Sequence, residues 1–246
     1  MMGETEWYSD WFDSKYYHIL YQNRDNAEAE HFISNLIHFL QPQKEAHILD
    51  LACGKGRHST FLNEMGFRVT GLDLSAYSIQ NAIQYENDRL KFAVHDMRQV
   101  YSNEEFEYIF NLFTSFGYFN SNVENQKVIY AIENQLKNGG VLVLDYLNAD
   151  KVIATLKQDE VIELDGIEFI IRREVADNNV VKSISFQAEG KQYNIQERVE
   201  LLNKNDFINF FNATSLRLIH TFGSYDLQEY IPTKSDRLIL LAKKEK

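Results

Sequence analysis

Between residues 46 and 148 the chain alternates short apolar runs with segments of helical periodicity, and this alternation constrains the fold more than any other feature. Short apolar runs are typical of buried strands, whereas apolar residues spaced three and four apart are typical of amphipathic helices. The runs are AHILDLA, GFRVTGLDLS, LKFAVHDM, FEYIFNLFTSF and GVLVLDYLN. Because strands that alternate with helices are joined by right-handed crossovers, the sequence predicts an α/β fold around a mostly parallel sheet.

The helices of this region are expected over residues 57–65, 76–87 and 125–137. Asn138, Gly139 and Gly140 are expected to cap the last of them, because glycine tolerates the left-handed conformation that ends many helices. Apolar residues also recur at helical spacing in two stretches between residues 4 and 40, and Pro42 ends that pattern. The chain is therefore expected to begin with helices.

The pattern changes after residue 158. Four β-type runs, EVIEL, IEFIIRREVA, NVVKSISFQAE and KQYNIQERVELL, are separated by short turns. They predict a small antiparallel β insertion of three or four strands over residues 158–202. A helix is expected next, and then two strands, LRLIHTFG and DRLILLAKK. The segment between these strands has no room for a crossover helix, so the last strand pair is predicted to be antiparallel.

Charge and composition narrow the range of partners. The net charge is −11, from 25 Lys and Arg against 36 Asp and Glu. Binding to nucleic-acid phosphates or to anionic lipid needs clustered basic residues, so neither partner is expected. The single cysteine, Cys53, excludes a disulfide within the chain. The acidic N-terminal sequence is not a secretory signal and no apolar run reaches the roughly 18 residues that span a bilayer, so a cytoplasmic protein is expected.

A turn with two glycines, ACGKG, follows the first apolar run. Ligands of doubly wound sheets bind beyond the carboxyl ends of the strands, and Gly54 and Gly56 allow the backbone to approach a ligand closely. Asp73 is expected to end the second strand, where a carboxylate can accept hydrogen bonds from ribose hydroxyls. Asp96 is expected to end the third strand, where it can accept from an adenine amino group.

Two residues argue against a dinucleotide at this turn. Ser59 stands where the third glycine of a Gly-x-Gly-x-x-Gly motif would fall. Asp50 lies inside the first strand, close to the turn. A carboxylate beside an anionic pyrophosphate is unfavourable, whereas a carboxylate beside the ammonium and sulfonium groups of a cationic cofactor is favourable.

The order of acid, glycine turn, acid and acid, followed by an antiparallel strand pair, resembles the class I S-adenosylmethionine-dependent methyltransferases. The resemblance covers about residues 46–150 and 215–245 and rests on ILDLACGKG, VTGLDLS, VHDM and NLFTSFGYF. It implies a Rossmann-like, seven-stranded, mostly parallel sheet with an antiparallel last strand pair, and S-adenosylmethionine as the cofactor. The β insertion and the N-terminal helices look like those of a small-molecule subgroup that includes sugar N-methyltransferases, in which they cover the active site.

The resemblance implies a cofactor site made of the acids, the glycine turn and neighbouring apolar side chains. Its expected members are Asp50, Ala52, Gly54, Gly56, Asp73, Leu74, Asp96, Met97 and Phe113. Asp50 would orient the ammonium of the cofactor, Asp73 would bind the ribose, and Asp96 would bind the adenine amine. Phe113 is expected to end strand four and to line the methionine side. Ala52 stands where the family usually has glycine, which is a small departure.

The N-terminal segment WYSDWFDSKYYHILYQNRD is rich in aromatic residues. It is predicted either to form a lid that excludes water from methyl transfer or to pack against the sheet edge. As a lid it would bring Tyr17 to the cofactor and Arg24 to the cofactor carboxylate. The predicted domains are an N-terminal helical lid over 1–42, a Rossmann-like methyltransferase domain over 43–157 and 203–246, and the β insertion over 158–202.

No general base stands out in the sequence. Tyr118, in TSFGYF, is a candidate to orient the acceptor, and His18 is a candidate base. N-methylation needs only a neutral amine lone pair, whereas methylation of an alcohol needs a base or a metal, and no spacing predicts a metal site.

The sequence thus predicts methyl transfer from S-adenosylmethionine to a small molecule, with N-methylation favoured. The alternatives are methylation of tRNA or protein, and a non-catalytic protein that binds S-adenosylmethionine or S-adenosylhomocysteine. The acceptor and the oligomeric state stay open.

Overall fold

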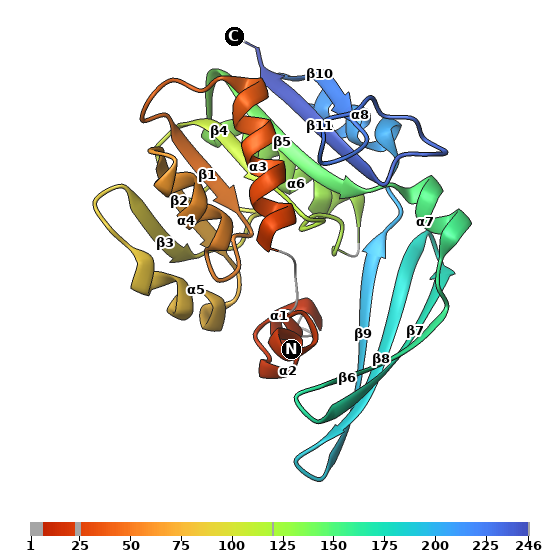
Figure 1. Ribbon diagram of the computed structural model, residues 1–246. Coiled ribbons are helices and arrows are strands. Elements are labelled where there is room, and N and C mark those ends of the chain that lie inside the picture. Colours follow the sequence, from red (N-terminus) through yellow and green to blue (C-terminus); the bar gives the residue numbers. More distant parts are fainter. Residues whose placement is uncertain (1–6, 23–25, 120, 246) are drawn as a thin grey trace.

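The computed structural model describes residues 7–22, 26–119 and 121–245, and its strands form two sheets (Figure 1). The strands of the larger sheet are β1 (His47–Leu51), β2 (Arg68–Asp73), β3 (Leu90–Val94), β4 (Phe106–Asn111), β5 (Leu136–Leu147), β10 (Leu216–Phe222) and β11 (Arg237–Lys244). Those of the smaller sheet are β6 (Asp159–Leu164), β7 (Ile167–Ala176), β8 (Asn179–Ala188) and β9 (Lys191–Glu200).

The larger sheet has seven strands among the described residues, in the order β10-β11-β5-β4-β1-β2-β3. Neighbours from β5 to β3 pair in parallel, whereas β11 pairs antiparallel with both β5 and β10. The predicted fold class, with its antiparallel last strand pair, is confirmed. The order of the strands reverses between β1 and β4, so a crevice for a ligand is expected beyond their carboxyl ends.

Helices cover both faces of the larger sheet. They are α3 (Asn26–Leu40), α4 (Arg57–Glu64), α5 (Ala76–Ala82), α6 (Asn122–Gln135) and α8 (Lys204–Asn212), with a short 3-10 helix, η1 (Ile83–Tyr85), after α5. A further helix, α7 (Ala149–Thr155), lies beyond the end of β5, where the chain enters the smaller sheet (Figure 1). Successive residues of a strand point to opposite faces. In β1, Ile48 packs in the cluster that contains α3, α4 and α5, whereas Leu49 packs in the cluster that contains α6 and α8.

The prediction for the end of α6 is wrong. The helix ends at Gln135, and Leu136 already pairs with Phe106 as the first residue of β5. Gly139 has a φ of +80° inside β5, where the pairing with β4 is irregular, and it does not cap the helix. The physical reason is that Leu136 is fully buried in the sheet, and this burial outweighs the local preference for a glycine cap.

The N-terminal helices α1 (Trp7–Phe12) and α2 (Lys15–Leu20) lie beside the smaller sheet, at the edge of the larger sheet where β1 and β2 end (Figure 1). The smaller sheet is antiparallel throughout, as predicted for the insertion. Trp11 and Tyr16 pack in one hydrophobic cluster with Phe169 and Phe186 of that sheet. The helical pattern of the N-terminal segment is thus present as three helices, two of which contact the insertion. No helix in the described part of the chain has both the length and the apolar composition to cross a membrane.

Candidate functional site

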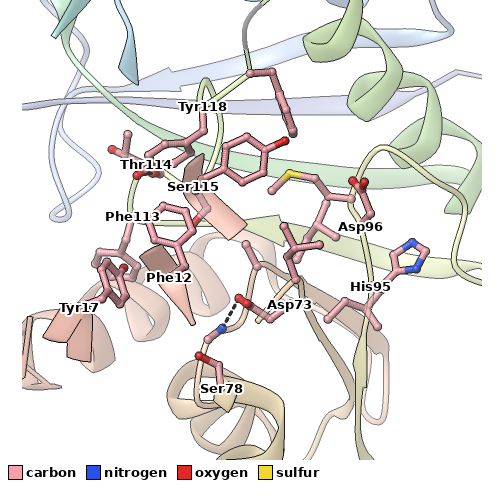
Figure 2. Close-up of a pocket in the computed structure, with 18 residues that line it drawn as sticks. Phe12, Tyr17, Asp73, Ser78, His95, Asp96, Phe113, Thr114, Ser115 and Tyr118 are labelled. Carbon is pink, nitrogen blue, oxygen red and sulfur yellow. Dashed lines mark hydrogen bonds between the residues drawn. The ribbon is translucent and has the colours of Figure 1, made fainter. Parts of the chain in front are cut away.

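A cavity lies beyond the carboxyl ends of β1, β2 and β4, and we call it the inner cavity (Figure 2). Of the predicted cofactor residues, its lining includes Ala52, Gly54, Asp73, Leu74, Asp96 and Met97. Tyr17, Phe113 and Tyr118 line it as well. Phe113 does not end β4 as predicted, because the strand stops at Asn111 and Phe113 lies in the following turn. The folding of the chain therefore brings together residues that are far apart in the sequence.

A second cavity, the outer cavity, adjoins the first. Its lining includes Asp50, Cys53, Arg57, His58, His18 and Tyr21. Both cavities are lined by Tyr17, Ala52, Gly54, Ser78, Phe113 and Ser115. The glycine turn and the turn after β4 therefore form the boundary between an inner and an outer space.

The turn after β1 owes its shape to left-handed backbone conformations. Ala52, Gly54 and Gly56 have φ values of 66°, 56° and 79°. A Cβ atom added to Gly54 would meet nothing within 4 Å, so the turn is open on that side. A Cβ atom on Gly56 would lie 2.5 Å from Phe92 Cζ. Gly56 is not among the described residues that line the two cavities, and its glycine is explained by packing.

Asp73 joins the end of β2 to the glycine turn. The Gly54 N–H donates to Asp73 Oδ2 at 2.8 Å, and Figure 2 marks this bond with a dashed line. The Ser75 N–H donates to Asp73 Oδ1, also at 2.8 Å. Burial raises the pKa of the Asp73 carboxyl, and these two amides act against that shift. An ionised carboxylate offers about four acceptor sites, so Asp73 can accept two further hydrogen bonds from a ligand.

Asp50 lies at the end of β1 and only 2% of it is exposed. The hydroxyl of Ser59 donates to Asp50 Oδ2 at 2.6 Å. Burial raises the pKa of Asp50 to about 6, although the Ser59 hydrogen bond lowers it. The sequence identified Ser59 only as a missing glycine. Its position in the first turn of α4, behind an acid in the preceding strand, was the available signal for a hydrogen-bond partner.

Asp96 lies two residues beyond the end of β3 and is held by an arginine that the sequence reasoning missed. Arg98 donates to both carboxylate oxygens, with Arg98 Nη2 2.6 Å from Asp96 Oδ2. Arg98 also pairs with Glu124 at 2.9 Å. Burial alone would raise the pKa of Asp96, but the hydrogen bonds and charge of Arg98 outweigh burial and lower it. The carboxylate is therefore ionised and fixed in orientation at neutral pH.

Aromatic side chains enclose the inner cavity. The ring centroid of Phe12 lies 5.0 Å from that of Tyr17 and 5.3 Å from that of Tyr118, and all three rings are visible in Figure 2. The Tyr118 hydroxyl donates to the Thr114 carbonyl at 2.9 Å. His18 lines the outer cavity and stacks on Tyr77 at 4.7 Å. Arg24 lies outside the described residues.

The N-terminal helices are attached to both sides of the site. Asp13, between α1 and α2, accepts hydrogen bonds from the Ser75 hydroxyl at 2.7 Å and from the Tyr77 N–H at 2.8 Å. Trp11 Nε1 donates to Glu197 of β9 at 2.6 Å. Neither contact was predictable from the sequence, because Asp13 and Glu197 each resemble ordinary surface acids. The helices therefore bridge the start of α5 and the insertion.

No group of three or more His, Cys, Asp or Glu side chains is placed to hold a metal ion in the part of the chain that the structure describes. The site is instead defined by three acids, an open glycine turn and aromatic walls at the carboxyl ends of parallel strands. These features are typical of a methyltransferase that uses a cationic nucleoside cofactor.

The chain belongs to the family described as "Methyltransferase domain", whose model matches residues 42–206. This match confirms the family predicted from the sequence. Because the matched region contains all three acids and the glycine turn, the candidate site lies within it.

Particular relatives agree with this assignment. The chain is 32% identical to a glycine/sarcosine N-methyltransferase of Aphanothece halophytica over 135 residues, which are 53% of this chain and 49% of that protein. The chain spans about half the length of the curated relatives it matches first.

Two solved structures share the fold over nearly the whole chain. An S-adenosylmethionine-dependent methyltransferase from Clostridium acetobutylicum superposes with a TM-score of 0.78 at 20% identity and covers 94% of this chain and 96% of its own. An amino pentose methyltransferase from Micromonospora echinaspora, solved with S-adenosylmethionine bound, has a TM-score of 0.71 at 17% identity and covers 94% and 97%. Both similarities confirm the fold.

Proposed function

We propose that the protein transfers a methyl group from S-adenosylmethionine to the nitrogen of a small molecule. The observation that carries the proposal is the link between the glycine turn and Asp73, at which the Gly54 amide and the Ser75 amide hold a carboxylate beside an open turn. A carboxylate in this position suits the two hydroxyls of a ribose. Asp50 supplies a second buried acid that suits an ammonium group.

The residues present fit this cofactor. Asp73 would hold the ribose, Asp96 and the Met97 backbone the adenine, and Asp50 the ammonium. The expected contacts with the methionine part are Ala52, Gly54 and Phe113, whereas Leu74 would pack on the adenine. Gly56, the further contact expected from the sequence, would act by shaping the turn, because it is not among the described residues that line either cavity. When bound, S-adenosylmethionine supplies an electrophilic methyl group on a positively charged sulfur. The negative charges of Asp50 and Asp73 complement that positive charge at close range.

The aromatic residues of the N-terminal helices are proposed to exclude water. Phe12 and Tyr17 line the inner cavity, and their helices are attached both to α5 and to the insertion. Aromatic faces also favour a cationic sulfur or an amine. Residues 1–42 are therefore proposed to act as a lid, with Tyr17 against the cofactor, and residues 158–202 as the support on which it closes. The proposed Arg24 contact with the cofactor carboxylate belongs to the same lid.

A nitrogen acceptor is favoured over an oxygen acceptor. A neutral amine carries its own lone pair, so the protein needs only to position it and to let its proton leave afterwards. The relative from Aphanothece halophytica is named as an N-methyltransferase of glycine and sarcosine, which supports a small amine as the acceptor. Tyr118 and His18 remain proposals for orienting the acceptor and taking up its proton.

Calorimetry with S-adenosylmethionine and with NAD tests the cofactor, and a labelled-methyl assay against a panel of small amines tests the transfer. We expect the protein to bind S-adenosylmethionine but not NAD, and the assay to yield a labelled small product. Asp73→Asn is the binding-deficient control. Binding of NAD in its place would refute the proposal. Cofactor binding with transfer only to tRNA or protein, or with no transfer to any acceptor, would support the alternatives predicted from the sequence.

A further inference from the structure

The turn that follows β4 has an unusual backbone. Phe113 and Thr114 both have a φ of 58°, in the left-handed region, although neither is glycine. Side chains with a Cβ atom rarely adopt this conformation, and two such residues in succession persist only where the surroundings hold them. Neighbouring groups must therefore hold this turn in its conformation.

Asp145 of β5 holds the backbone of the turn. It is fully buried, and its Oδ2 accepts a hydrogen bond from the Phe113 N–H at 2.7 Å. The carbonyl of Asp145 accepts from the Thr114 N–H at 3.1 Å. One residue of the neighbouring strand thus binds the two successive amides that the left-handed conformation presents. A buried carboxylate needs a positive partner as well, because burial of an unpaired charge is strongly unfavourable.

Arg237, the first residue of β11, is that partner. Its Nε donates to Asp145 Oδ1 at 2.8 Å, and its Nη2 donates to Thr114 Oγ1 at 2.8 Å. The guanidinium lies 5.5 Å from the ring centroid of Tyr225, and Tyr225 stacks on Phe32 of α3 at 4.5 Å. The arginine therefore binds the acid and the turn with separate nitrogens, and aromatic packing limits its movement.

The turn determines where the Phe113 ring lies. That ring lines both the inner and the outer cavity and stacks on His58 at 4.7 Å. Asp145 and Arg237 are not among the described residues that line either cavity. They lie behind the turn and reach the cavities only through Phe113 and Thr114.

We propose that Asp145 and Arg237 are positioning residues that fix the turn at residues 113–115 and so place the Phe113 ring at the boundary where the methyl group passes from cofactor to acceptor. This inference rests on the proposed function. On that function, the adenosine half of the cofactor lies by Asp73 and Asp96, at the ends of β2 and β3, whereas the turn follows β4 on the other side of β1. The methionine half lies against the turn. Loss of the Asp145–Arg237 pair therefore impairs recognition of one half of the cofactor only.

Binding of two ligands, S-adenosylmethionine and adenosine, tests this division. Asp145→Asn replaces two acceptor oxygens with one oxygen and one NH2 group. Whichever way the amide is oriented, its NH2 group faces another donor, either the Phe113 N–H or Arg237, and one hydrogen bond is lost. Thr114→Val replaces the hydroxyl that accepts from Arg237 with a methyl group and keeps the ion pair. Because Thr114 also lines the inner cavity, Asp145→Asn, whose residue does not, is the primary test. Glu160→Gln is the matched control, because it likewise replaces the acid of an arginine ion pair with its amide. Glu160 pairs with Arg173 in the insertion, and the side chain of Arg173 is 20% exposed against 19% for Arg237.

We expect Asp145→Asn to lower the affinity for S-adenosylmethionine by about tenfold or more, because it removes a hydrogen bond to a charged group. We expect Thr114→Val to lower it by about threefold, because the acceptor that it removes is neutral. Adenosine affinity is expected to change by less than about twofold in both variants, and Glu160→Gln is expected to change the affinity for neither ligand. Calorimetry gives the affinities, and circular dichroism shows whether each variant is folded. If Asp145→Asn does not fold, Thr114→Val carries the test.

Equal losses for both ligands would show a merely structural role and overturn the inference, as would unchanged affinity for S-adenosylmethionine. If the wild-type protein binds both ligands and the variants lose affinity for both equally, the inference fails and the proposed function stands. A wild-type protein that binds neither overturns the proposed function, and the inference with it.

Discussion

Replacement of Asp50 with Asn is expected to stabilise the ligand-free protein and to weaken its binding of S-adenosylmethionine. Burial, which outweighs the hydrogen bond from Ser59, raises the pKa of Asp50 from 3.8 to about 6. A carboxyl group whose pKa is higher in the folded than in the unfolded state destabilises the folded state once it is ionised. Asn has nearly the same shape, carries no charge, and still offers an oxygen to the Ser59 hydroxyl.

The size and sign of the effect follow from the pKa. A shift of about two units corresponds to about 3 kcal/mol of unfolding free energy, since each unit is worth about 1.4 kcal/mol. Below pH 3.8 both states carry the proton and the penalty is absent. It grows as the pH rises toward about 6, because the folded state then holds a proton that the unfolded state has lost, and it is constant above that value.

Urea unfolding of wild type and Asp50→Asn from about pH 4 to about pH 8 measures this difference. His47, whose pKa burial lowers to about 4, destabilises the folded state as the pH falls through the same range, which is the opposite direction. Because both proteins contain His47, its contribution cancels in the comparison. A difference that does not vary with pH, or an Asn variant that is less stable at neutral pH, would refute the reasoning.

The same substitution is expected to lower the affinity for S-adenosylmethionine at neutral pH by about tenfold, as for loss of a charge-assisted contact. The wild-type affinity should rise as the pH passes about 6, where Asp50 ionises, whereas the affinity of the variant should not follow that titration. Calorimetry at several pH values measures both. Equal affinities would refute the ammonium assignment and leave the stability argument intact.

Three further predictions follow from contacts around the site. Asp73→Asn is expected to weaken both S-adenosylmethionine and adenosine by about tenfold or more, because the ribose belongs to both ligands, and an unchanged dissociation constant in calorimetry would contradict this. Gly56→Ala is expected to lower the unfolding free energy by about 2 kcal/mol or more, because its Cβ would lie 2.5 Å from Phe92 and φ is +79°; thermal unfolding measures this loss. Glu197→Gln is expected to speed proteolysis within residues 7–22, because it weakens the acceptor of Trp11 Nε1, whereas the exposed Glu163→Gln serves as the control.

The sequence predicted the sheet and the position of the acids, because both depend on patterns that are local along the chain. Alternating apolar runs and helical segments determine a parallel sheet, and parallel strands bring their carboxyl ends to one edge. Asp50 and Asp73 each stand at the end of such a run, so their meeting at the glycine turn followed from topology. The proximity of these two acids could therefore be predicted without knowledge of any contact between them.

The long-range contacts that hold the turn at Phe113 and the N-terminal helices were not predictable in the same way. Asp145 and Arg237 are 92 residues apart in the sequence, and Trp11 and Glu197 are 186 apart. No spacing rule relates residues at such separations, because their contact depends on how the last strands and the insertion pack against the rest. Arg98, only two residues from Asp96, was accessible in principle from a local pattern of acid followed by base.

Two unfavourable features of the structure lie at the cavities: Asp50 lines the outer cavity, and the turn at Phe113 lies between the two. An acid buried with a raised pKa and two successive left-handed residues without glycine each lower stability, and a single substitution could relieve either. Natural proteins keep such features mainly where function needs them. On the proposed function, the ionised Asp50 is unfavourable in the ligand-free protein and is stabilised when the ammonium group of the cofactor binds beside it. The left-handed turn at Phe113 is likewise unfavourable by itself. The hydrogen bonds of the turn with Asp145 and Arg237 offset its cost and hold the Phe113 ring between the two cavities.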